Sequence, residues 1–295
     1  SLNYNTLNSG FRPTRGRQVS LSTEFAGLGG DVRYLRFRGQ GRQFWDVANS
    51  GFIFSVSLEG GTVIPLRERT GAGVDDVFLT DRFFLGEPQF RGFDIRGVGP
   101  RVLRQNALPD LANNPNFALL DEDGNVAFNP DRQRQRDDAL GGRYYDLGRA
   151  ELELPLGTGA RELGLRPSIW LDVGALWGLT TPLLDSSAVF SQRVESPAFD
   201  ANGDPLLDDD GNQIINVGFF DTLDATDDDG NPNAISATNF REIFVGNSPS
   251  PRVTAGIGVN WNSPFGPFRI DFAQTIRKVE GDDDKQLTFN VGTQF

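Results

Sequence analysis

The feature that most constrains this chain is an alternation of apolar and polar residues with a period of two. In the segment QLTFNVGTQF, the side chains of Leu287, Phe289, Val291 and Phe295 point to one face, and polar or small residues point to the other. Seven similar segments precede it, at about 18–26, 35–38, 52–59, 149–154, 165–175, 253–261 and 268–272. A strand of about nine to eleven residues is long enough to cross a bilayer when tilted. The pattern therefore predicts an all-β protein with about eight antiparallel strands.

The lengths of the links between these segments favour a membrane barrel over a soluble sandwich. The third link, at about 64–142, and the fifth, at about 178–250, are very long, whereas the links that alternate with them are short. Long external loops and short periplasmic turns are typical of outer-membrane barrels. We therefore expect residues 1–295 to form a transmembrane β-barrel domain in the bacterial outer membrane, with both long loops external and both chain ends periplasmic.

The polar face of the predicted strands carries many charges. Its members are Arg36, Arg38, Glu59, Arg149, Glu151, Asp172, Arg269 and Asp271. Charged residues on this face predict a wet, charged interior in place of a packed apolar core. The alternative is a half-solvated antiparallel sheet of a soluble domain.

Composition excludes many enzyme mechanisms. The chain has no Cys and no His, so disulfides, thiol nucleophiles, the usual zinc sites and His-based triads are excluded. We expect no enzymatic activity and no cofactor. The net charge of −12, without a basic stripe, argues against binding to nucleic acid.

Acidic turns recur in the second long loop. The sequence DDDGN at 208–212 brings Asp208, Asp210 and Asn212 together, and such oxygen ligands are weak candidates for calcium. The glutamate that an EF-hand loop needs at its twelfth position is missing. Solvated Asp-Gly turns are therefore favoured over a metal site.

The first long loop contains the sequence DRFFLGEPQFRGFDIRGVGPR at 81–101, called the RGF segment below. Its glycines and two Arg-Gly pairs predict a tightly turned loop. Together with GGRYYDLGRAELELPLG, IWLDVGALWG and the terminal FNVGTQF, it resembles the barrel of the BamA family of bacterial surface antigens. Arg91, Gly92 and Phe93 match the RGF signature of that family, whereas Glu87 stands where the family has a second glycine.

The resemblance implies a larger parent protein. The family barrel has sixteen strands preceded by periplasmic POTRA domains, and this chain resembles its last eight strands without a POTRA domain. In the family, the external loop folds back into the barrel and its arginine meets carboxylates of the inner wall. Arg91 would then pair with Asp172 and with Glu151.

The same resemblance implies a function in membrane protein assembly. The expected role is folding and insertion of β-barrel proteins through a lateral seam, with the strand at Leu287–Phe295 as a sorting signal and seam edge. The implied partners are nascent outer-membrane proteins, accessory lipoproteins, and outer-membrane lipids including lipopolysaccharide. A translocation pore of the same superfamily that exports a partner protein, or a passive porin, are the alternatives.

Overall fold

The computed structural model of the chain describes most of its residues. They are 1–10, 12–27, 29, 32–47, 50–110, 114–119, 126–156, 164–184, 191–197, 205–207, 213, 215–221, 240–263 and 266–291. The chain divides into two compact units. The first comprises Ser1–Arg101, Ala139–Leu183 and Phe244–Phe295, and the second comprises Val102–Asp138 and Leu184–Ile243.

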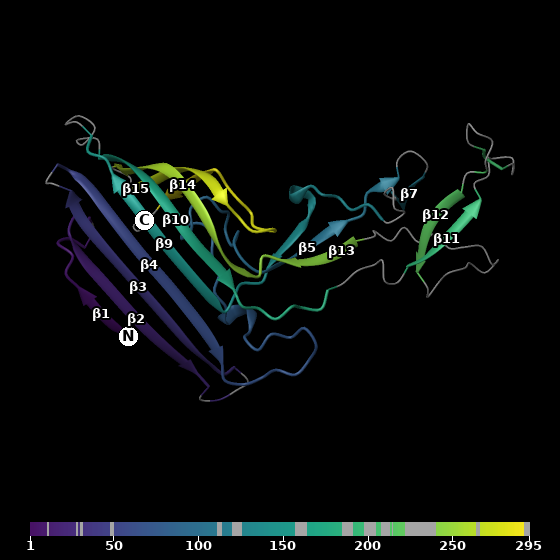
Figure 1. Ribbon diagram of the computed structural model, residues 1–295, viewed down its shortest axis with the longest axis horizontal. Coiled ribbons are helices and arrows are strands. Elements are labelled where there is room, and N and C mark those ends of the chain that lie inside the picture. The colour runs from purple at the N-terminus through teal and green to yellow at the C-terminus, as the bar shows by residue number, and fades with distance from the viewer. Residues whose placement is uncertain are drawn as a thin grey trace. The chain divides into compact units, whose positions relative to one another are not determined.

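The first unit is built on one antiparallel sheet of nine strands (Figure 1). In their order across the sheet, the strands are β1 (Leu2–Asn5), β2 (Gly16–Ala26), β3 (Tyr34–Val47), β4 (Phe52–Pro65), β9 (Tyr144–Glu153), β10 (Leu165–Trp177), β14 (Ser248–Ser263), β15 (Gly266–Arg277) and β16 (Leu287–Val291). The strands of this sheet thus lie side by side in the same order in which they follow one another along the chain. The all-β, antiparallel prediction is confirmed, and the described sheet is a partial barrel with two edges.

The remaining elements are short. A three-stranded sheet has the order β13 (Phe240–Val245), β5 (Arg101–Asn106) and β8 (Arg136–Ala139). Two hairpins pair β6 (Pro109–Asp110) with β7 (Asn114–Ala118), and β11 (Ser191–Pro197) with β12 (Ile215–Asp221). Single 3₁₀ turns are η1 (Leu79–Asp81) and η2 (Arg132–Arg134). In the described part of the chain, no helix is both long and apolar enough to cross a membrane.

The eight expected strands are all present, and β1 is an additional one. β1 pairs with Gln18–Leu21 of β2, so this part of β2 has a partner strand on its outer side. The prediction missed β1 because four residues are too few for a period-two pattern to stand out. The long links, β4 to β9 and β10 to β14, leave the sheet from the same end, because every connected pair of strands is antiparallel.

One face of the sheet is apolar and exposed. Large side chains on this face include Leu21, Leu58, Ile169, Ile257, Ile270, Phe272 and Phe289. Aromatic pairs lie near both ends of the strands on the same face: Trp45 with Phe54, Trp261 with Phe268, and Tyr144 with Trp177. Aromatic belts that border an apolar band are typical of barrels in lipid.

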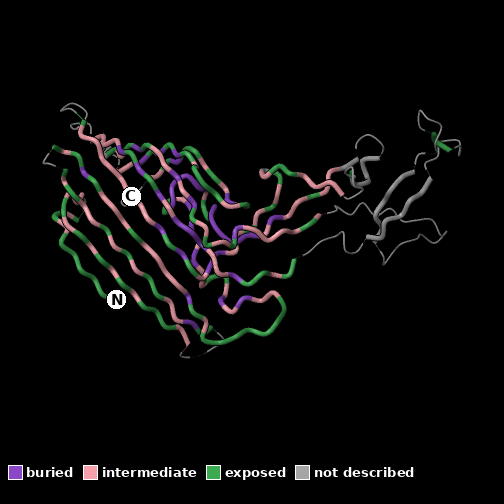
Figure 2. Tube along the Cα trace, viewed as in Figure 1, coloured by how far each residue is buried: buried purple, intermediate pink, exposed green. Residues whose placement is uncertain are grey.

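The opposite face is partly covered by the RGF segment. Apolar residues of this segment pack with strand residues, and with Val77 of the loop before the segment, in one core cluster: Tyr34, Val63, Val77, Phe83, Leu85, Phe90, Phe93, Val98, Tyr145, Leu147 and Leu176. Figure 2 shows the buried residues gathered there, while β1 to β3 are mostly half-buried or exposed. The expectation of an interior without an apolar core is therefore wrong at this part of the wall. The reason is that the loop supplies the apolar partners, which strand periodicity cannot indicate.

Candidate functional site

Arg91 lies at the centre of a buried ionic network on the polar face of the sheet. Its Nε and Nη2 donate to Oδ2 and Oδ1 of Asp172 at 2.8 and 2.6 Å, and its Nη1 donates to Oε2 of Glu151 at 2.7 Å. Asp172 is 0% exposed and Arg91 is 6% exposed. The two parallel bonds to Asp172 use the planar fork of the guanidinium, which a lysine could not reproduce. The structure thus brings Arg91, Asp172 and Glu151 together.

β9, β10 and β15 supply the other members of this network. Arg269 forms two hydrogen bonds with Asp271, at 2.7 and 2.9 Å, and its Nη2 lies 3.0 Å from Oε1 of Glu151. Arg149 faces Asp172 across the strand pair, with its Nε 4.0 Å from Oδ2. Three arginines therefore surround three carboxylates, so the network is balanced in charge where it is withdrawn from water.

Trp170 forms a platform beneath Arg91. It precedes Asp172 by two residues on β10, so both side chains share a face, and its ring centroid lies 4.1 Å from the guanidinium carbon. A desolvated arginine over an aromatic ring gains a favourable cation–π interaction. Gly256 faces Trp170 on β14, and a Cβ at Gly256 would come within 2.4 Å of the indole. Alternation along β10 places Trp170 on the polar face with Asp172, but periodicity cannot indicate its contact with an arginine from a loop.

The two residues after Arg91 fix the loop against the wall. Gly92 has a φ of 85°, and a Cβ there would lie 2.9 Å from Cγ2 of Thr254. Thr254 donates from Oγ1 to the carbonyl of Arg91 at 2.8 Å. Phe93 is fully buried and packs edge-on against Phe90, with ring centroids 4.8 Å apart. Close approach at Gly92 and burial of Phe93 therefore explain two positions of the RGF signature.

Two further buried carboxylates were not found from the sequence. Asp75 accepts hydrogen bonds from Arg143 and from the backbone N–H groups of Val77 and Thr180. Burial alone would raise the pKa of Asp75, but these hydrogen bonds outweigh it and hold the pKa below its ordinary value. Asp282 binds Arg252 at 2.9 Å, and both side chains are fully buried. Both carboxylates lie in loops, where no periodicity predicts burial.

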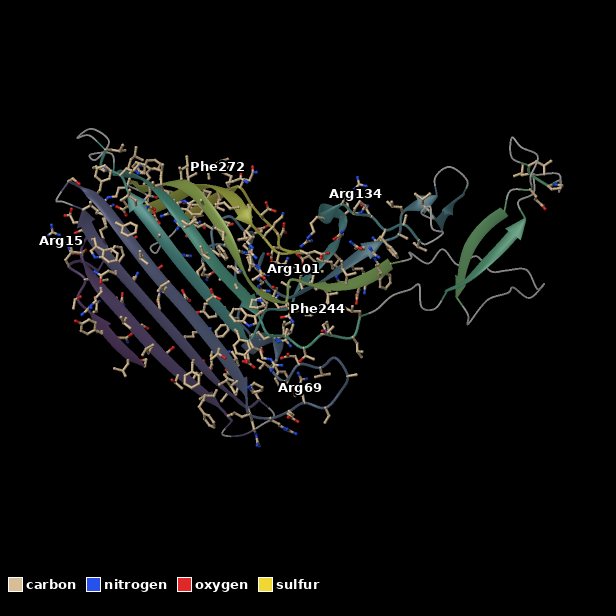
Figure 3. All side chains as sticks on the ribbon, viewed as in Figure 1. Arg15, Arg69, Arg101, Arg134, Phe244 and Phe272 are labelled. Atoms are coloured by element: carbon tan, nitrogen blue, oxygen red, sulfur yellow. The ribbon has the colours of Figure 1, made fainter. Side chains whose placement is uncertain are left out.

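The wall beyond the RGF segment is hollowed and polar. A cavity of about 170 Å³ is lined by Ser20, Ser22, Arg38, Gly39, Gln40, Glu59 and Tyr145. Tyr145 donates from its hydroxyl to Glu59 at 2.6 Å. Figure 3 shows the side chains on both faces of the sheet, among them the exposed Phe272 of β15. This part of the polar face carries the hydrophilic lining that the alternation predicted.

The last strand keeps its predicted faces over the described residues. Leu287, Phe289 and Val291 are each at least 60% exposed, whereas Thr288 between them is buried. β16 pairs with β15 through five residue pairs, and among the described strands it has no partner on its other side. Phe295 lies outside the described residues.

The calcium candidates Asp208, Asp210 and Asn212 also lie outside the described residues. Within the part that is described, no group of three or more acidic side chains could hold a metal ion. The site on the wall offers paired charges and a fixed loop. Its evident chemistry is to hold that loop in position.

Comparison with known proteins gives the family. The profile of the Omp85 superfamily domain matches residues 1–295. The outer membrane protein assembly factor BamA of Neorickettsia risticii is 26% identical over 298 residues, covering 100% of this chain and 27% of that protein. The sorting and assembly machinery component 50 homolog of Bos taurus is 34% identical over 107 residues, covering 34% of this chain and 20% of that protein.

A solved structure supports the same fold. The crystal structure of BamA from Haemophilus ducreyi lacking POTRA domains 1–3 matches with a TM-score of 0.55 and 19% identity. The match covers 97% of this chain and 40% of that chain. This chain thus spans only about a quarter of the length of the BamA relative from Neorickettsia risticii. The chain belongs to the Omp85 superfamily, and its sequence and fold resemble a carboxyl-terminal portion of a BamA-family barrel.

Proposed function

We propose that this chain is part of an outer-membrane assembly factor that folds and inserts β-barrel proteins into the bacterial outer membrane without covalent chemistry. The names of the BamA and sorting-machinery relatives support this role. The observation that carries it is β16, a short strand with an apolar outer face and an unpaired edge in the described sheet.

An unpaired strand edge can accept another strand. Its free N–H and C=O groups form main-chain hydrogen bonds with an extended segment, and this is the basis of β-augmentation. In lipid, such groups have no water to bind, so a client strand would satisfy both itself and the edge. β16 would thus serve as one side of a lateral seam at which nascent outer-membrane proteins are added.

The RGF site would hold the wall beside this seam in one arrangement. Arg91 joins β9 and β10 through Glu151 and Asp172, and the backbone of the same loop contacts Thr254 on β14. Arg91, Gly92 and Phe93 are therefore proposed as the functional loop. Asp172 and Glu151 are proposed as its lumen partners, and Leu287, Phe289, Val291 and Phe295 as the seam and sorting strand.

The setting of the proposal is the Gram-negative outer membrane. The loops at about 64–142 and 178–250 would be external, and both ends of the chain periplasmic. Nascent outer-membrane proteins would be the clients, accessory lipoproteins the protein partners, and outer-membrane lipids including lipopolysaccharide the surroundings of the apolar face. Nucleic acid is not a proposed partner.

Reconstitution tests the function directly. The intact protein containing this chain is placed in lipid vesicles, and a small urea-denatured outer-membrane barrel is added as the client. The folded fraction of the client is followed by its mobility on gels without heating. We expect faster folding than in empty vesicles and a loss of that gain when the intact protein is heat-denatured first.

Two other results would count against the proposal. Equal folding rates with and without the intact protein would indicate a passive barrel. Release of a single dedicated partner into the vesicle lumen, without insertion of the barrel client, would indicate a translocation pore. Depletion of the intact protein in cells provides a second check, since unchanged porin levels in the outer membrane would contradict an assembly role.

A further inference from the structure

The loop between β15 and β16, at 278–286, forms a backbone ladder with the RGF segment. The N–H of Asp94 donates to the carbonyl of Asp283 at 2.9 Å, and the N–H of Lys285 donates to the carbonyl of Gly92 at 3.1 Å. These bonds flank Phe93 and Asp284, which lie opposite each other as an antiparallel bridge. The N–H of Asp283 also donates to the carbonyl of Gly97 at 2.8 Å. Two loops far apart in sequence are thus paired like strands.

A glycine allows this close approach. Gly97 does not have a positive φ, so its backbone conformation is open to other residues. A Cβ at Gly97, however, would lie 2.5 Å from the carbonyl oxygen of Asp283. Real Cβ atoms do not approach backbone this closely, so the two loops would have to move apart. A Cβ would also lie 2.8 Å from the backbone of Asp94, so both the contact between the loops and the turn of the RGF segment itself require glycine here.

A buried ion pair between Asp282 and Arg252 also fixes the loop at 278–286. Asp282 accepts from Nε of Arg252 at 2.9 Å, from the N–H of Gly99 at 3.2 Å and from the N–H of Val279 at 2.7 Å. Arg252 also donates to the carbonyls of Gly246, Ser248 and Ser250. The pair therefore joins the start of β14, the end of the RGF segment and the loop at 278–286.

Ion pairs between side chains also support the backbone ladder that joins these two loops. Lys285 binds Glu87 at 2.9 Å and lies 3.6 Å from Asp94. The hydrogen bond to Glu87 raises the pKa of Lys285 above its ordinary value. Lys278 also pairs with Asp284 within the loop. These exposed pairs add alignment more than stability.

We propose that residues 278–286, called the clasp below, couple two movements. They are the release of the RGF segment from the wall and the displacement of the last hairpin, β15 and β16. The clasp uses none of the side chains that bind Arg91, so the loop is held at two separate points. Since β16 pairs only with β15 among the described strands, the clasp is its main further restraint at this end of the sheet. On the proposed function, the state of the RGF segment would thereby regulate the strand at the seam.

Amide hydrogen exchange on the intact protein in lipid vesicles tests this coupling. Asp282→Asn removes the carboxylate charge that pairs with Arg252. Gly97→Ala adds a Cβ that would lie 2.5 Å from the carbonyl oxygen of Asp283 and so forces the loops apart. We expect each variant to speed exchange by about tenfold or more both at 92–97 and at 287–291, because exchange reports local opening. Asp283→Asn is the matched control: it neighbours Asp282, and its backbone groups carry the ladder. That control is expected to leave exchange in both segments unchanged.

The reciprocal variant completes the test. Arg91→Ala releases the loop at the wall, and coupling requires that exchange at 287–291 also rises. If Asp282→Asn or Gly97→Ala loosens only one of the two segments, or if Arg91→Ala leaves 287–291 unchanged, the clasp proposal is overturned. If Asp282→Asn fails to fold, Gly97→Ala and Arg91→Ala carry the test with the same expectations.

Client folding is measured on the same samples. Faster exchange in both segments, with unchanged client folding, would support the clasp and contradict only its role at the seam. The failure of the clasp is therefore distinguishable from the failure of the proposed assembly function.

Discussion

At the scale of single residues, Arg91 provides the most direct prediction. Arg91→Ala would leave the buried Asp172 without the guanidinium that binds it and would remove one of the two arginines that bind Glu151. Breaking a buried ion pair costs about 3–5 kcal/mol. We expect a loss near the lower limit, about 3 kcal/mol, because Arg149 and Arg269 remain close to the two carboxylates. Urea unfolding in lipid vesicles, followed by gel mobility, measures this loss.

The second Arg-Gly pair of the same segment provides the control. Arg96 is exposed, and its guanidinium carbon lies 4.6 Å from the ring centroid of Phe84. Arg96→Ala should change the free energy of unfolding by less than about 1 kcal/mol, because exposed contacts contribute little. Equal losses for the two variants would show that Arg91 is not specially held. Arg91→Lys should lie between them, since it keeps the charge and loses the fork.

Asp75 gives a prediction about pH. Its pKa is lower in the folded protein than in the unfolded chain, so the carboxylate stabilises the fold above its unfolded pKa of about 3.9. That contribution is lost as pH falls through the folded pKa. Between about pH 5 and pH 2, stability should therefore fall more steeply in the wild-type protein than in Asp75→Asn. Unfolding of both proteins at a series of pH values checks this, and equal slopes would contradict the assignment to Asp75.

The residues of the site differ in how far the sequence could indicate them. Alternation alone assigns Glu151 and Asp172 to the polar face, because a strand places every second side chain on one side. The position of Arg91 against the wall was predicted only from the resemblance to the BamA family, because a residue in a loop has no periodicity that indicates where its side chain points. Asp282 and its partner Arg252 could not be paired, because only the folded loop brings them together.

At the scale of elements, the apolar face can be tested by depth. Ile257 lies in the middle of β14 and Ile276 near the end of β15, and both are at least 60% exposed. If this face meets hydrocarbon, an arginine at Ile257 should cost about 2–4 kcal/mol, whereas one at Ile276 should cost about 0–1 kcal/mol. Unfolding in vesicles of the intact protein gives both values.

Equal costs at the two positions would contradict a lipid-facing surface. A soluble sheet exposed to water would tolerate either arginine, and a sheet packed against protein would reject both strongly. The two isoleucines are a matched pair because they have similar exposure in the structure. Their difference therefore reports the depth in the membrane.

The existence of the strands was largely predictable from the sequence, but the residues at which they begin and end were not. Polar and apolar faces alternate clearly along β14 and β15, so their existence and direction follow from sequence. β3 and β4, however, continue to 14 residues each, through the Gly39, Gly41, Gly60 and Gly61 positions that interrupt the pattern. β3 and β4 pair along their full lengths, so hydrogen bonding extends them where side-chain patterning is weak.

At the scale of the molecule, the long loops contribute to two different units. Residues 81–101 of the first long loop belong to the unit of the nine-stranded sheet, whereas Val102–Asp138 and Leu184–Ile243 form the other unit. Loop length alone could not reveal this division. The part that covers the polar wall is the RGF segment, because it supplies Phe83, Leu85, Phe90, Phe93 and Val98 to the core cluster.

This division predicts how the intact protein conducts ions. Replacing 88–95 with a Gly-Ser linker of equal length removes Arg91, Phe90 and Phe93, and so removes the contacts that hold the segment against the wall. In a planar bilayer the single-channel conductance should increase, because the freed loop no longer fills the lumen beside the polar lining of Arg38 and Glu59. Arg96→Ala, at an exposed side chain of the same segment, should leave conductance unchanged. Equal conductance in both variants would mean that the RGF segment does not restrict the lumen.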